Sequence, residues 1–359
     1  MIRYAVVGAG WISQEAFLPG VAQSGNSCVA ALVTGDPGRV RPLAEFHGIP
    51  QVVSYAEYDA LLAGDPVDVD AVYIALPNSM HADYAIRAAR AGKHVLVEKP
   101  LSRTEAEARA MIAAAEAAGV FLMTAYRLHN EPGTIAVLEK IRAGAIGQPL
   151  FFQSVFGFQA ALGNHRLKAE HWGGALQDIG VYCVNAARHV FAEEPVEATA
   201  QLHKPDGDPR FAEIEATVAA TLRFPSGGIA QIIVSFGSAS IDSYRVVGST
   251  GDLELDPGYR FETATRLRLR TAGGAIEETS FPRVDHFGGQ ATYFSDCIAA
   301  GQPPEADGAE GLADMVVLLA IEEAARTGRA VPIALPPRPR HPAADMIRIC
   351  PVTDRRLLL

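Results

Sequence analysis

Residues 4–13 read Tyr4-Ala5-Val6-Val7-Gly8-Ala9-Gly10-Trp11-Ile12-Ser13, an apolar run followed by two glycines and the beginning of a helical pattern. The run matches G-x-G-x-x-(G/A), with Ser in the third place. Small residues there let the backbone approach a pyrophosphate group at the positive end of a helix. A glycine pair alone can simply make a tight turn, but the strand, loop and helix context favours dinucleotide binding. We predict contacts from Gly8, Gly10, Trp11 and Ile12.

The rest of the first third alternates β-branched runs with helical patterns. Strands are predicted at 29–33, 71–76, 94–97 and 121–125, with helices between them, including one at 78–92. The clearest helix runs from Thr104 to Gly119, with Thr104 as N-cap, Glu107 completing a capping box and Gly119 as the stop. Near-continuous apolar strands that alternate with helices predict a parallel sheet covered on both faces. We therefore expect a doubly wound α/β domain over residues 1–125.

From about residue 151 the pattern changes to successive strands with little helix between them. These strands are predicted at 196–202, 214–224, 228–236 and 243–247, with glycine-containing turns at 226–228 and 248–251. They indicate a mainly antiparallel or mixed sheet in an α+β domain over residues 126–335, which includes a late helix at 308–328. A proline-rich stretch at 336–340 then breaks regular structure. We expect residues 336–359 to form a peripheral, solvated tail.

Length and composition agree with two folded domains. A chain of 359 residues is longer than the roughly 250–300 residues at which single cores stop growing. Its 49% hydrophobic and 20% charged residues exclude the composition of a disordered protein. The 31 Lys and Arg against 41 Asp and Glu give a formal charge of −10, which repels phosphate backbones and argues against a general nucleic-acid binder. Any phosphate group must then be bound locally.

Signals for export, membrane insertion and metal binding are not recognised in the sequence. Residues 1–4 lead directly into the first strand, without room for the parts of a signal peptide. No apolar stretch approaches the roughly 20 residues that span a bilayer. Cys28, Cys183, Cys297 and Cys350 are scattered without CxxC spacing, which argues against a disulfide framework or a zinc cluster. We expect a cytoplasmic protein with reduced thiols, no membrane partner and no metal site.

The end of the second predicted strand, Thr34-Gly35-Asp36-Pro37-Gly38-Arg39, should face the adenosine ribose. An acidic side chain at the strand tip would accept from the ribose hydroxyls and repel a 2′-phosphate, whereas Thr34 is neutral and Arg39 is a nearby cation. NADP is therefore favoured over NAD, with Thr34, Gly35 and Arg39 in contact. In the alternative, Asp36 reaches the ribose, Arg39 is a surface charge and NAD is the cofactor.

Two further loops follow strands whose carboxyl ends should lie at the ligand-binding edge of the sheet. One begins at the strand end Leu76 and continues as Pro77-Asn78-Ser79-Met80-His81, and the other reads Val97-Glu98-Lys99-Pro100. Both are expected to border the nicotinamide. The contacts predicted from them are Leu76, Pro77, Asn78, His81, Glu98 and Lys99. Taken alone, Lys99 is more typical of a solvated loop, whereas Glu98 and Asn78 could be caps and His81 a buried helix residue.

A candidate for the second domain is Gly173-Gly174-Ala175-Leu176-Gln177-Asp178-Ile179-Gly180-Val181-Tyr182. Asp178 and Tyr182 are four residues apart and project from one helix face, where Gly180 leaves space. In isolation, the pair is better explained by Asp178 as a charge in the first helical turn and Tyr182 as a core aromatic residue.

These motifs, taken in order, resemble one family. Gly8-Ala9-Gly10, Pro77 to His81, Glu98-Lys99-Pro100, Tyr126-Arg127 and Gly173 to Tyr182 are similar to the glucose-fructose oxidoreductase / inositol dehydrogenase (Gfo/Idh/MocA) family over about residues 1–330. The stretches 71–100 and 178–195 most resemble the glucose-fructose oxidoreductase branch, which has Tyr where inositol dehydrogenase-like members have His. The resemblance implies a Rossmann domain followed by an open mixed-sheet domain. It also implies hydride transfer between a nicotinamide and a sugar or polyol carbon.

The resemblance further implies roles for individual residues. Lys99, Asp178 and Tyr182 become catalytic candidates. Other residues implied to line the site are Tyr126, Arg127 as a cofactor contact, His165, Arg166 and Trp172. Faces of the second sheet associate in this family, which implies a homodimer or a homotetramer.

Elementary electrostatics supports a tyrosine base assisted by a lysine. An unperturbed tyrosine pKa near 10 is about three units too high for pH 7, which costs roughly 4 kcal/mol. One ammonium at about 4 Å, with an effective dielectric constant of about 20, supplies roughly that amount. Lys99 beside Tyr182 would therefore suffice. Asp178 would position Lys99 or a substrate hydroxyl, although its charge opposes ionisation of the phenol.

The expected function is therefore an NADP-dependent sugar oxidoreductase with a small sugar-like substrate. A dihydrodiol or xylose dehydrogenase-like activity remains open, and so does a catalytically silent, NADP-sensing regulatory protein on the same scaffold. The name-giving enzyme of the branch carries an N-terminal segment that wraps its NADP. Because Met1 lies almost at the first strand here, we expect an exchangeable cofactor and sequential kinetics.

Overall fold

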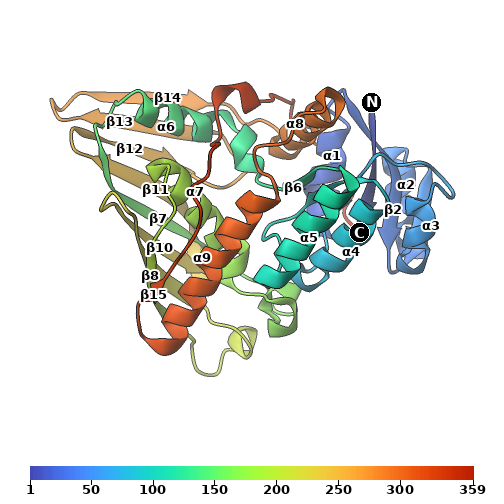
Figure 1. The fold of residues 1–359 in the computed structure, drawn as a ribbon, viewed down its shortest axis with the longest axis horizontal. Helices are drawn as coiled ribbons and strands as arrows, with labels where there is room; N and C mark the ends of the chain where they lie inside the picture. Colours follow the sequence, from blue (N-terminus) through green and yellow to red (C-terminus); the bar gives the residue numbers. More distant parts are fainter. The chain divides into compact units, whose positions relative to one another are not determined.

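The strand that leads into the glycine loop, β1 (Ile2–Val7), lies inside a six-stranded parallel sheet in the computed structural model, which describes residues 1–359 (Figure 1). The sheet order is β3-β2-β1-β4-β5-β6. The other strands are β2 (Ser27–Thr34), β3 (Gln51–Ser54), β4 (Ala71–Ile74), β5 (His94–Val97) and β6 (Leu122–Thr124). Strand order reverses at β1, so the loops after β1 and β4 open at a topological switch point. The predicted doubly wound α/β fold is confirmed, whereas β3 was missed because only Val52 and Val53 are apolar in it.

Short helices connect these strands, and the sheet is buried between them. Tyr4 to Val7 and Ala71 to Ile74 have no solvent exposure, as expected for a sheet covered on both faces. The helical segments are η1 (Ser13–Phe17), α1 (Leu18–Val21), α2 (Pro37–His47), η2 (Tyr55–Glu57), α3 (Tyr58–Leu62), η3 (Asn78–Met80), α4 (His81–Arg90), α5 (Glu105–Ala118), η4 (Arg127–Asn130) and α8 (His286–Ala300).

The predicted helix at 104–119 shows how the sequence sets its ends. Thr104 accepts a hydrogen bond from the N–H of Glu107 at 3.2 Å, and Gly119 ends α5 in the left-handed conformation with φ of 66°. The Glu107 carboxylate accepts from the N–H of Arg103 at 3.1 Å, one residue before the position that a capping box requires. The two ends are thus as predicted, with the acidic side chain bonded one residue earlier.

The second sheet has nine strands in the order β14-β13-β12-β11-β7-β10-β9-β8-β15. Only β7 and β10 pair in parallel, so the predicted mixed, mainly antiparallel sheet is confirmed. Its strands are β7 (Pro149–Gln159), β8 (Glu197–His203), β9 (Thr217–Arg223), β10 (Ile229–Ser235), β11 (Gly237–Gly248), β12 (Gly251–Asp256), β13 (Thr265–Thr271), β14 (Ile276–Phe281) and β15 (Val331–Pro332). The long helices after β6 are α6 (Pro132–Arg142), α7 (Val181–Phe191) and α9 (Gly308–Thr327). Figure 1 shows helices along one face of this sheet only.

The uncovered face of the nine-stranded sheet carries apolar side chains. Along β7 and β10, inward residues such as Phe152 and Ile232 are buried, while the alternate residues Phe151, Ile229 and Ile233 are each between 44% and 48% exposed. Phe151 lies opposite Ile229 in the register. The outward positions of these two strands thus carry exposed apolar side chains on either side of the exposed pair Gln153 and Gln231.

The chain divides into two compact units that differ from the sequence-based division. The first comprises residues 1–131, 284–312 and 346–359, and the second comprises 132–283 and 313–345. Residues 346–359, which were expected to be a solvated tail, thus belong to the first unit, where Met346 and Cys350 are each only 4% exposed. Local patterns cannot reveal this because the contacts are made with segments far away in the sequence.

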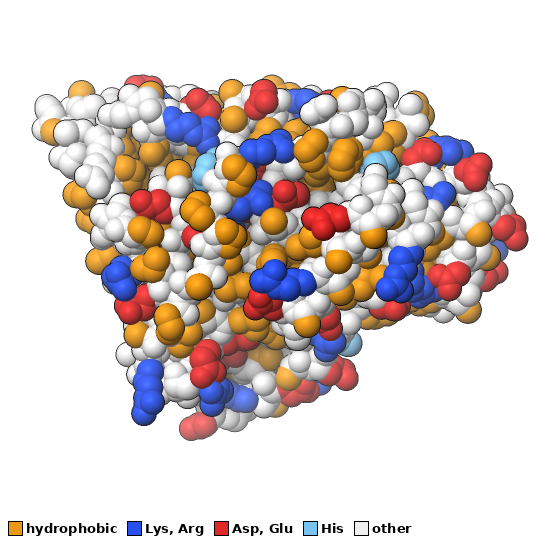
Figure 2. Space-filling view, viewed as in Figure 1, with side chains coloured by type: hydrophobic (Ala, Val, Ile, Leu, Met, Phe, Trp, Pro, Cys, Tyr) orange, Lys and Arg blue, Asp and Glu red, His pale blue; other side chains and the backbone are white.

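Charges of both signs are mixed over the surface that Figure 2 draws, with Lys and Arg side chains among Asp and Glu. None of the four cysteines forms a disulfide. No helix combines the length and the apolar character needed to cross a membrane.

A buried polar network in the second unit holds the start of the helix that carries Asp178. The indole N–H of Trp172 donates to Glu322 Oε1 at 2.9 Å, and the side-chain amide of Gln177 donates to the same oxygen. Trp172 has φ of 51°, a left-handed conformation that bulky residues rarely adopt. Glu322 lies on α9, so this bond fixes the segment before α7 against a distant helix.

Burial raises the pKa of Glu322 to about 7, although the two donors oppose this shift. Because the pKa of Glu322 is higher in the folded protein than its ordinary value of 4.5, the folded state binds this proton more tightly than the unfolded state does. The resulting stability of the fold is fully present below pH 4.5 and is lost as the pH rises through about 7. Glutamine stays neutral at every pH, so the variant Glu322→Gln should not lose this stability as the pH rises. The free energy of unfolding of the variant minus that of the wild type should therefore be larger at pH 8 than at pH 5, by roughly 1–2 kcal/mol. Urea denaturation at both pH values measures this difference, and the exposed Glu323→Gln variant is the control. A difference that does not change with pH would contradict the assignment.

Candidate active site

The glycine loop after β1 has the geometry that a phosphate group needs. Gly8 has φ of 99°, and a Cβ there would lie 2.5 Å from the carbonyl oxygen of Ala75, so only glycine fits. A Cβ on Gly10 would meet no protein atom within 4 Å. Packing within the protein therefore does not require glycine at this position, and the open space is available to a ligand. The loop fits a dinucleotide, with Gly8 and Gly10 as predicted backbone contacts.

The residues after the loop begin a helix with a wide turn. Ser13 Oγ donates to the Gly8 carbonyl oxygen at 2.6 Å and closes the loop. Trp11 is 50% exposed and Ile12 is half-buried, so both side chains remain accessible to a ligand. The first turn, η1, is π-helical, a geometry that often occurs at functional sites. Their predicted contacts with the cofactor stay predictions.

The last residue of β2 is the neutral Thr34. Thr34 is 7% exposed, and its hydroxyl accepts from the N–H of Asp36 at 3.4 Å. The Asp36 carboxylate accepts from the N–H of Arg39 at 3.0 Å and so serves as the N-cap of α2. Gly35 and the Arg39 side chain are exposed. Asp36 Oδ1 is engaged in this cap, and the residue that contacts the ribose stays a prediction.

His81 joins the two loops that are expected to border the nicotinamide. Its Nδ1 lies 2.9 Å from the Pro100 carbonyl oxygen and its Nε2 lies 2.9 Å from the Leu76 carbonyl oxygen. Burial lowers the pKa of His81, so the neutral ring can donate to only one of these two oxygens. Pro77 and Asn78, which follow Leu76 in the loop after β4, are half-exposed. His81 is thus placed to position the loops, and a direct contact with the cofactor stays a prediction.

Lys99 and Arg127 both act electrostatically on the Glu98 carboxylate. The Tyr73 hydroxyl donates to Glu98 Oε1 at 2.6 Å. Burial raises the pKa of Glu98, whereas Lys99, the Tyr73 hydroxyl and Arg127 favour its ionised form. Arg127 is 4% exposed, and its Nη1 lies 3.0 Å from His286 Nδ1. His286 was not found in the sequence because it lies 159 residues away from its partner.

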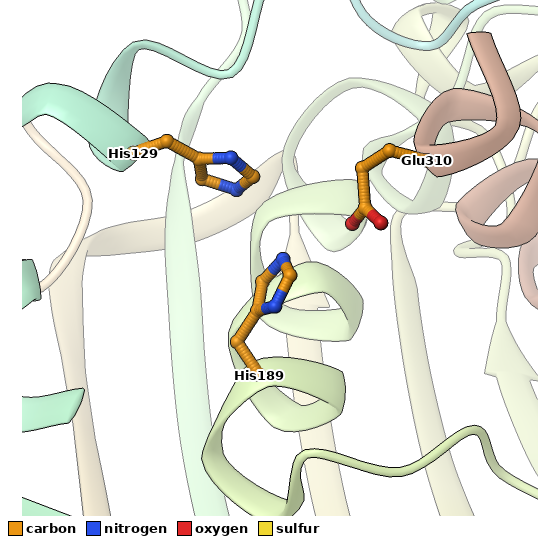
Figure 3. A group of neighbouring side chains, drawn as sticks. All are labelled: His129, His189 and Glu310. Atoms are coloured by element: carbon orange, nitrogen blue, oxygen red, sulfur yellow. The ribbon is translucent and has the colours of Figure 1, made fainter. Parts of the chain in front are cut away.

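Figure 3 draws two side chains of the first unit, His129 from η4 and Glu310 from the first turn of α9, whose ring nitrogen and carboxylate oxygen lie within 4.8 Å of each other. His129 Nδ1 is 2.8 Å from Glu305 Oε2, and both side chains are buried. The third side chain drawn, His189, belongs to α7 in the second unit, where its Nδ1 is 3.0 Å from His341 Nδ1. The bond between His129 and Glu305 fixes η4, the turn that also contains Arg127.

Asp178 and Tyr182 lie in the second unit where a π-helical turn, η7 (Leu176–Gly180), passes into α7. A π-helix has about 4.4 residues per turn, so residues four apart still share a face. Asp178 Oδ2 forms an ion pair with Arg166 Nε at 3.0 Å and is 18% exposed. A Cβ on Gly173 would lie 2.3 Å from the Arg166 carbonyl oxygen, which explains the glycine there. Arg166 is thus brought to Asp178, whereas the sequence suggested only a contact with substrate.

An aromatic floor supports Tyr182, which is 8% exposed. Its ring centroid is 6.2 Å from those of Phe156 and Tyr259. The Asp242 carboxylate accepts from the N–H groups of three consecutive residues, among them Tyr259 at 2.8 Å, and so fixes this loop. Burial raises the pKa of Asp242 to about 6 despite these bonds. Sequence reasoning missed Asp242 and Tyr259 because nothing local distinguishes them from ordinary strand and loop residues.

The predicted site residues thus form one group in each unit. Lys99 belongs to the first unit, while Asp178 and Tyr182 belong to the second. His165 and Trp172 lie with Arg166 in the segment before α7. The joint action of Lys99 and Tyr182 stays a prediction.

Comparison with known proteins identifies both units. A model described as "Oxidoreductase family, NAD-binding Rossmann fold" matches residues 2–126, and the GFO/IDH/MocA C-terminal domain matches residues 134–254. D-xylose 1-dehydrogenase (NADP(+)) 2 of Haloferax volcanii is 32% identical over 92% of this chain and 99% of its own length. Aldose-aldose oxidoreductase of Caulobacter crescentus, solved with glycerol, has a TM-score of 0.87 at 36% identity and covers 92% of this chain and 99% of its own.

A 3-ketoreductase of Actinomadura kijaniata, solved with NADP and TDP-benzene, has a TM-score of 0.80 at 29% identity. It covers 90% of this chain and 97% of its own. The matches to both family models and to full-length relatives show that the chain is an oxidoreductase of the Gfo/Idh/MocA family.

Proposed function

We propose that the protein transfers a hydride between NADP(H) and a carbinol or carbonyl carbon of a sugar or a related compound. The observation that carries this proposal is that Asp178 and Tyr182 share one helix of the second unit, on a buried aromatic floor, in a chain whose glycine loop fits a dinucleotide. The relatives support the substrate class, because their names describe a xylose dehydrogenase and an aldose-aldose oxidoreductase. When bound, the nicotinamide supplies the hydride chemistry.

The phosphate-binding end of the site favours NADP. The exposed Arg39 lies at the start of α2 beside the neutral Thr34, and a 2′-phosphate would be attracted by the guanidinium and by the positive end of the helix. Asp36 is engaged in the N-cap of the same helix. The xylose dehydrogenase is named for NADP, and the ketoreductase was solved with it. NAD remains the alternative cofactor.

Tyr182 is proposed to hold or release the proton of the reacting hydroxyl, with Lys99 as its electrostatic partner. The ion pair with Arg166 strengthens this assignment, because the guanidinium offsets the charge of Asp178 that would otherwise oppose ionisation of a nearby phenol. Arg166 also orients the Asp178 carboxylate, which can then accept from a substrate hydroxyl. Solved variants of the ketoreductase replace a tyrosine and a lysine, the same two residue types.

Turnover distinguishes this function from its alternatives. Nicotinamide fluorescence should be followed with aldoses, ketoses, polyols and trans-diols. Turnover of a sugar supports the proposal. A preference for xylose would indicate a xylose dehydrogenase-like activity, and a preference for trans-diols would indicate a dihydrodiol dehydrogenase-like activity. Cofactor binding without turnover of any of them would indicate a regulatory protein. A cytoplasmic location stays a prediction.

The two proposed proton-path residues should be essential for turnover. We expect Tyr182→Phe and Lys99→Met each to reduce kcat by about 10² to 10⁴-fold, because each removes the acid/base or its charge, with little change in NADPH affinity. Steady-state rates and fluorescence titration measure the two effects. Tyr244→Phe, in the same aromatic cluster, and Lys93→Met are matched controls. Wild-type rates in either active-site variant would remove that residue from the mechanism.

Cofactor preference should depend on the tip of β2. Thr34→Asp places a carboxylate that repels the 2′-phosphate and accepts from ribose hydroxyls, so the ratio of NADPH to NADH affinity should fall by about tenfold or more. Fluorescence titration with both cofactors measures the ratio. Thr104→Asp is a suitable control because aspartate also caps a helix. Equal affinities for the two cofactors in the wild type would contradict the assignment.

The uncovered face of the nine-stranded sheet is the proposed contact between subunits in a homodimer or a homotetramer. Its exposed apolar side chains Phe151, Ile229 and Ile233 would be buried by a second copy. We expect Ile233→Glu to shift the protein toward monomers, as measured by light scattering after gel filtration. Ile349→Glu, at a 72% exposed position of the first unit, is the control. A monomeric wild type would exclude this contact.

A further inference from the structure

Residues 351–359, here named the strap, lie against the two helical segments that follow β1 and β2. The residues just before the strap lie against α8. Arg348 forms an ion pair with Asp296 at 2.8 Å, and the Cys350 carbonyl oxygen accepts from the N–H of Asp285 at 3.0 Å. All of these residues belong to the first unit. The strap is therefore held in the same unit as the dinucleotide loop.

Two arginines fasten the strap to the outside of this unit. The Arg355 guanidinium donates to the Phe46 carbonyl oxygen at 3.0 Å and lies 5.1 Å from the centre of the Phe46 ring. A cation is favourable there because Phe46 is in the last turn of α2. Arg356 forms an ion pair with Glu15 on η1, whose side chain is only 13% exposed. The strap thus spans from the end of one helix to the beginning of the other.

The end of the strap meets residues of the cofactor site. The N–H of Leu359 donates to Gln14 Oε1 at 2.7 Å, and Arg39 Nη2 donates to the main-chain oxygen of Leu359 at 3.4 Å. Arg39 is the cation assigned to the 2′-phosphate. The strap therefore ends at the adenosine side of the proposed NADP site.

Gln14 connects the strap to the glycine loop itself. Its Nε2 donates to the Ala9 carbonyl oxygen at 2.6 Å, while its Oε1 accepts from Leu359. In a planar trans peptide, the Ala9 carbonyl and the Gly10 N–H point in opposite directions. A bond that fixes the carbonyl therefore also fixes the direction of the N–H, which can donate to a pyrophosphate. Gln14 is a positioning residue whose own orientation depends on the strap.

We propose that the strap is part of the cofactor site: it covers the adenosine half of NADP(H), and it slows release of the cofactor. The inference rests on the proposed function. It also changes the expectation of an uncovered cofactor, because the strap contacts Gln14 beside the glycine loop and Arg39 at the start of α2. Reduced exposure of a bound ligand lowers its rate of release more than it changes its rate of binding.

The positions of the contacts favour a cover over a competitor for the site. The bonds of Arg355 and Arg356 use Phe46 and Glu15, which are not among the predicted cofactor contacts. Only the 3.4 Å bond of Arg39 overlaps with the expected phosphate position. A 2′-phosphate can replace this weak, exposed bond while the rest of the strap remains in place.

The test compares the full chain with a variant that ends at residue 350. NADPH is bound, then chased with excess NADP⁺, and its fluorescence gives the rate of release. Removing the strap should raise this rate by about tenfold and weaken NADPH binding by a similar factor, because the change is in dissociation. Arg90→Gln, at an exposed position on α4, is the control and should leave both values unchanged.

A second pair of variants keeps the test valid if the shortened chain does not fold. Arg356→Glu should speed NADPH release by opposing Glu15, and adding Glu15→Arg should restore slow release. Trypsin gives an independent readout, because NADP⁺ should protect the peptide bonds after Arg355 and Arg356 in the full chain.

The outcomes separate the two proposals. A full chain that binds no NADPH would overturn both. If it binds NADPH but release is unchanged in the shortened chain and in Arg356→Glu, only the strap proposal is wrong. Tighter NADPH binding without the strap would show that the strap competes with the cofactor, which also overturns the proposal.

Discussion

Two hydrogen bonds from neighbouring side chains fix the peptide groups of the glycine loop, and the proposed chemistry depends on them. Ser13 bonds to the Gly8 carbonyl and Gln14 bonds to the Ala9 carbonyl, so the loop leaves β1 in one defined conformation. The absence of a side chain at Gly10 leaves room for a phosphate. Because β1 lies where the strand order reverses, this loop opens at the same edge as the loop after β4.

Buried polar groups extend this order to the surrounding loops. His81 lies 2.9 Å from a carbonyl oxygen of the loop after β4 and 2.9 Å from one of the loop after β5, and its neutral ring donates to one of them. The Tyr73 hydroxyl donates to Glu98 beside Lys99. In the second unit, Arg166 holds Asp178, and Asp242 holds the loop of Tyr259. Loss of a partner is most costly where the remaining polar group is buried, as it is for His81 and Asp242.

The strap illustrates how a segment with no regular structure can belong to a binding site. Its residues form neither helix nor strand, yet they make bonds to η1 and α2. Cover of this kind need not contact the reacting part of a ligand, since it acts by reducing the paths for escape. The same glycine loop is therefore held from within by Ser13 and from outside, through Gln14, by the strap.

The sequence by itself determined the parallel sheet, the mixed sheet and the helix ends at Thr104 and Gly119, because period, capping and glycine conformation act over a few neighbouring residues. It also marked Gly8, Gly10 and the spacing of Asp178 and Tyr182. Only the tertiary structure decided that Arg166 pairs with Asp178, that Glu322 holds Trp172, and that residues 346–359 join the first unit. The reason is that these contacts join residues 12 to more than 300 positions apart, where no local pattern constrains the partner.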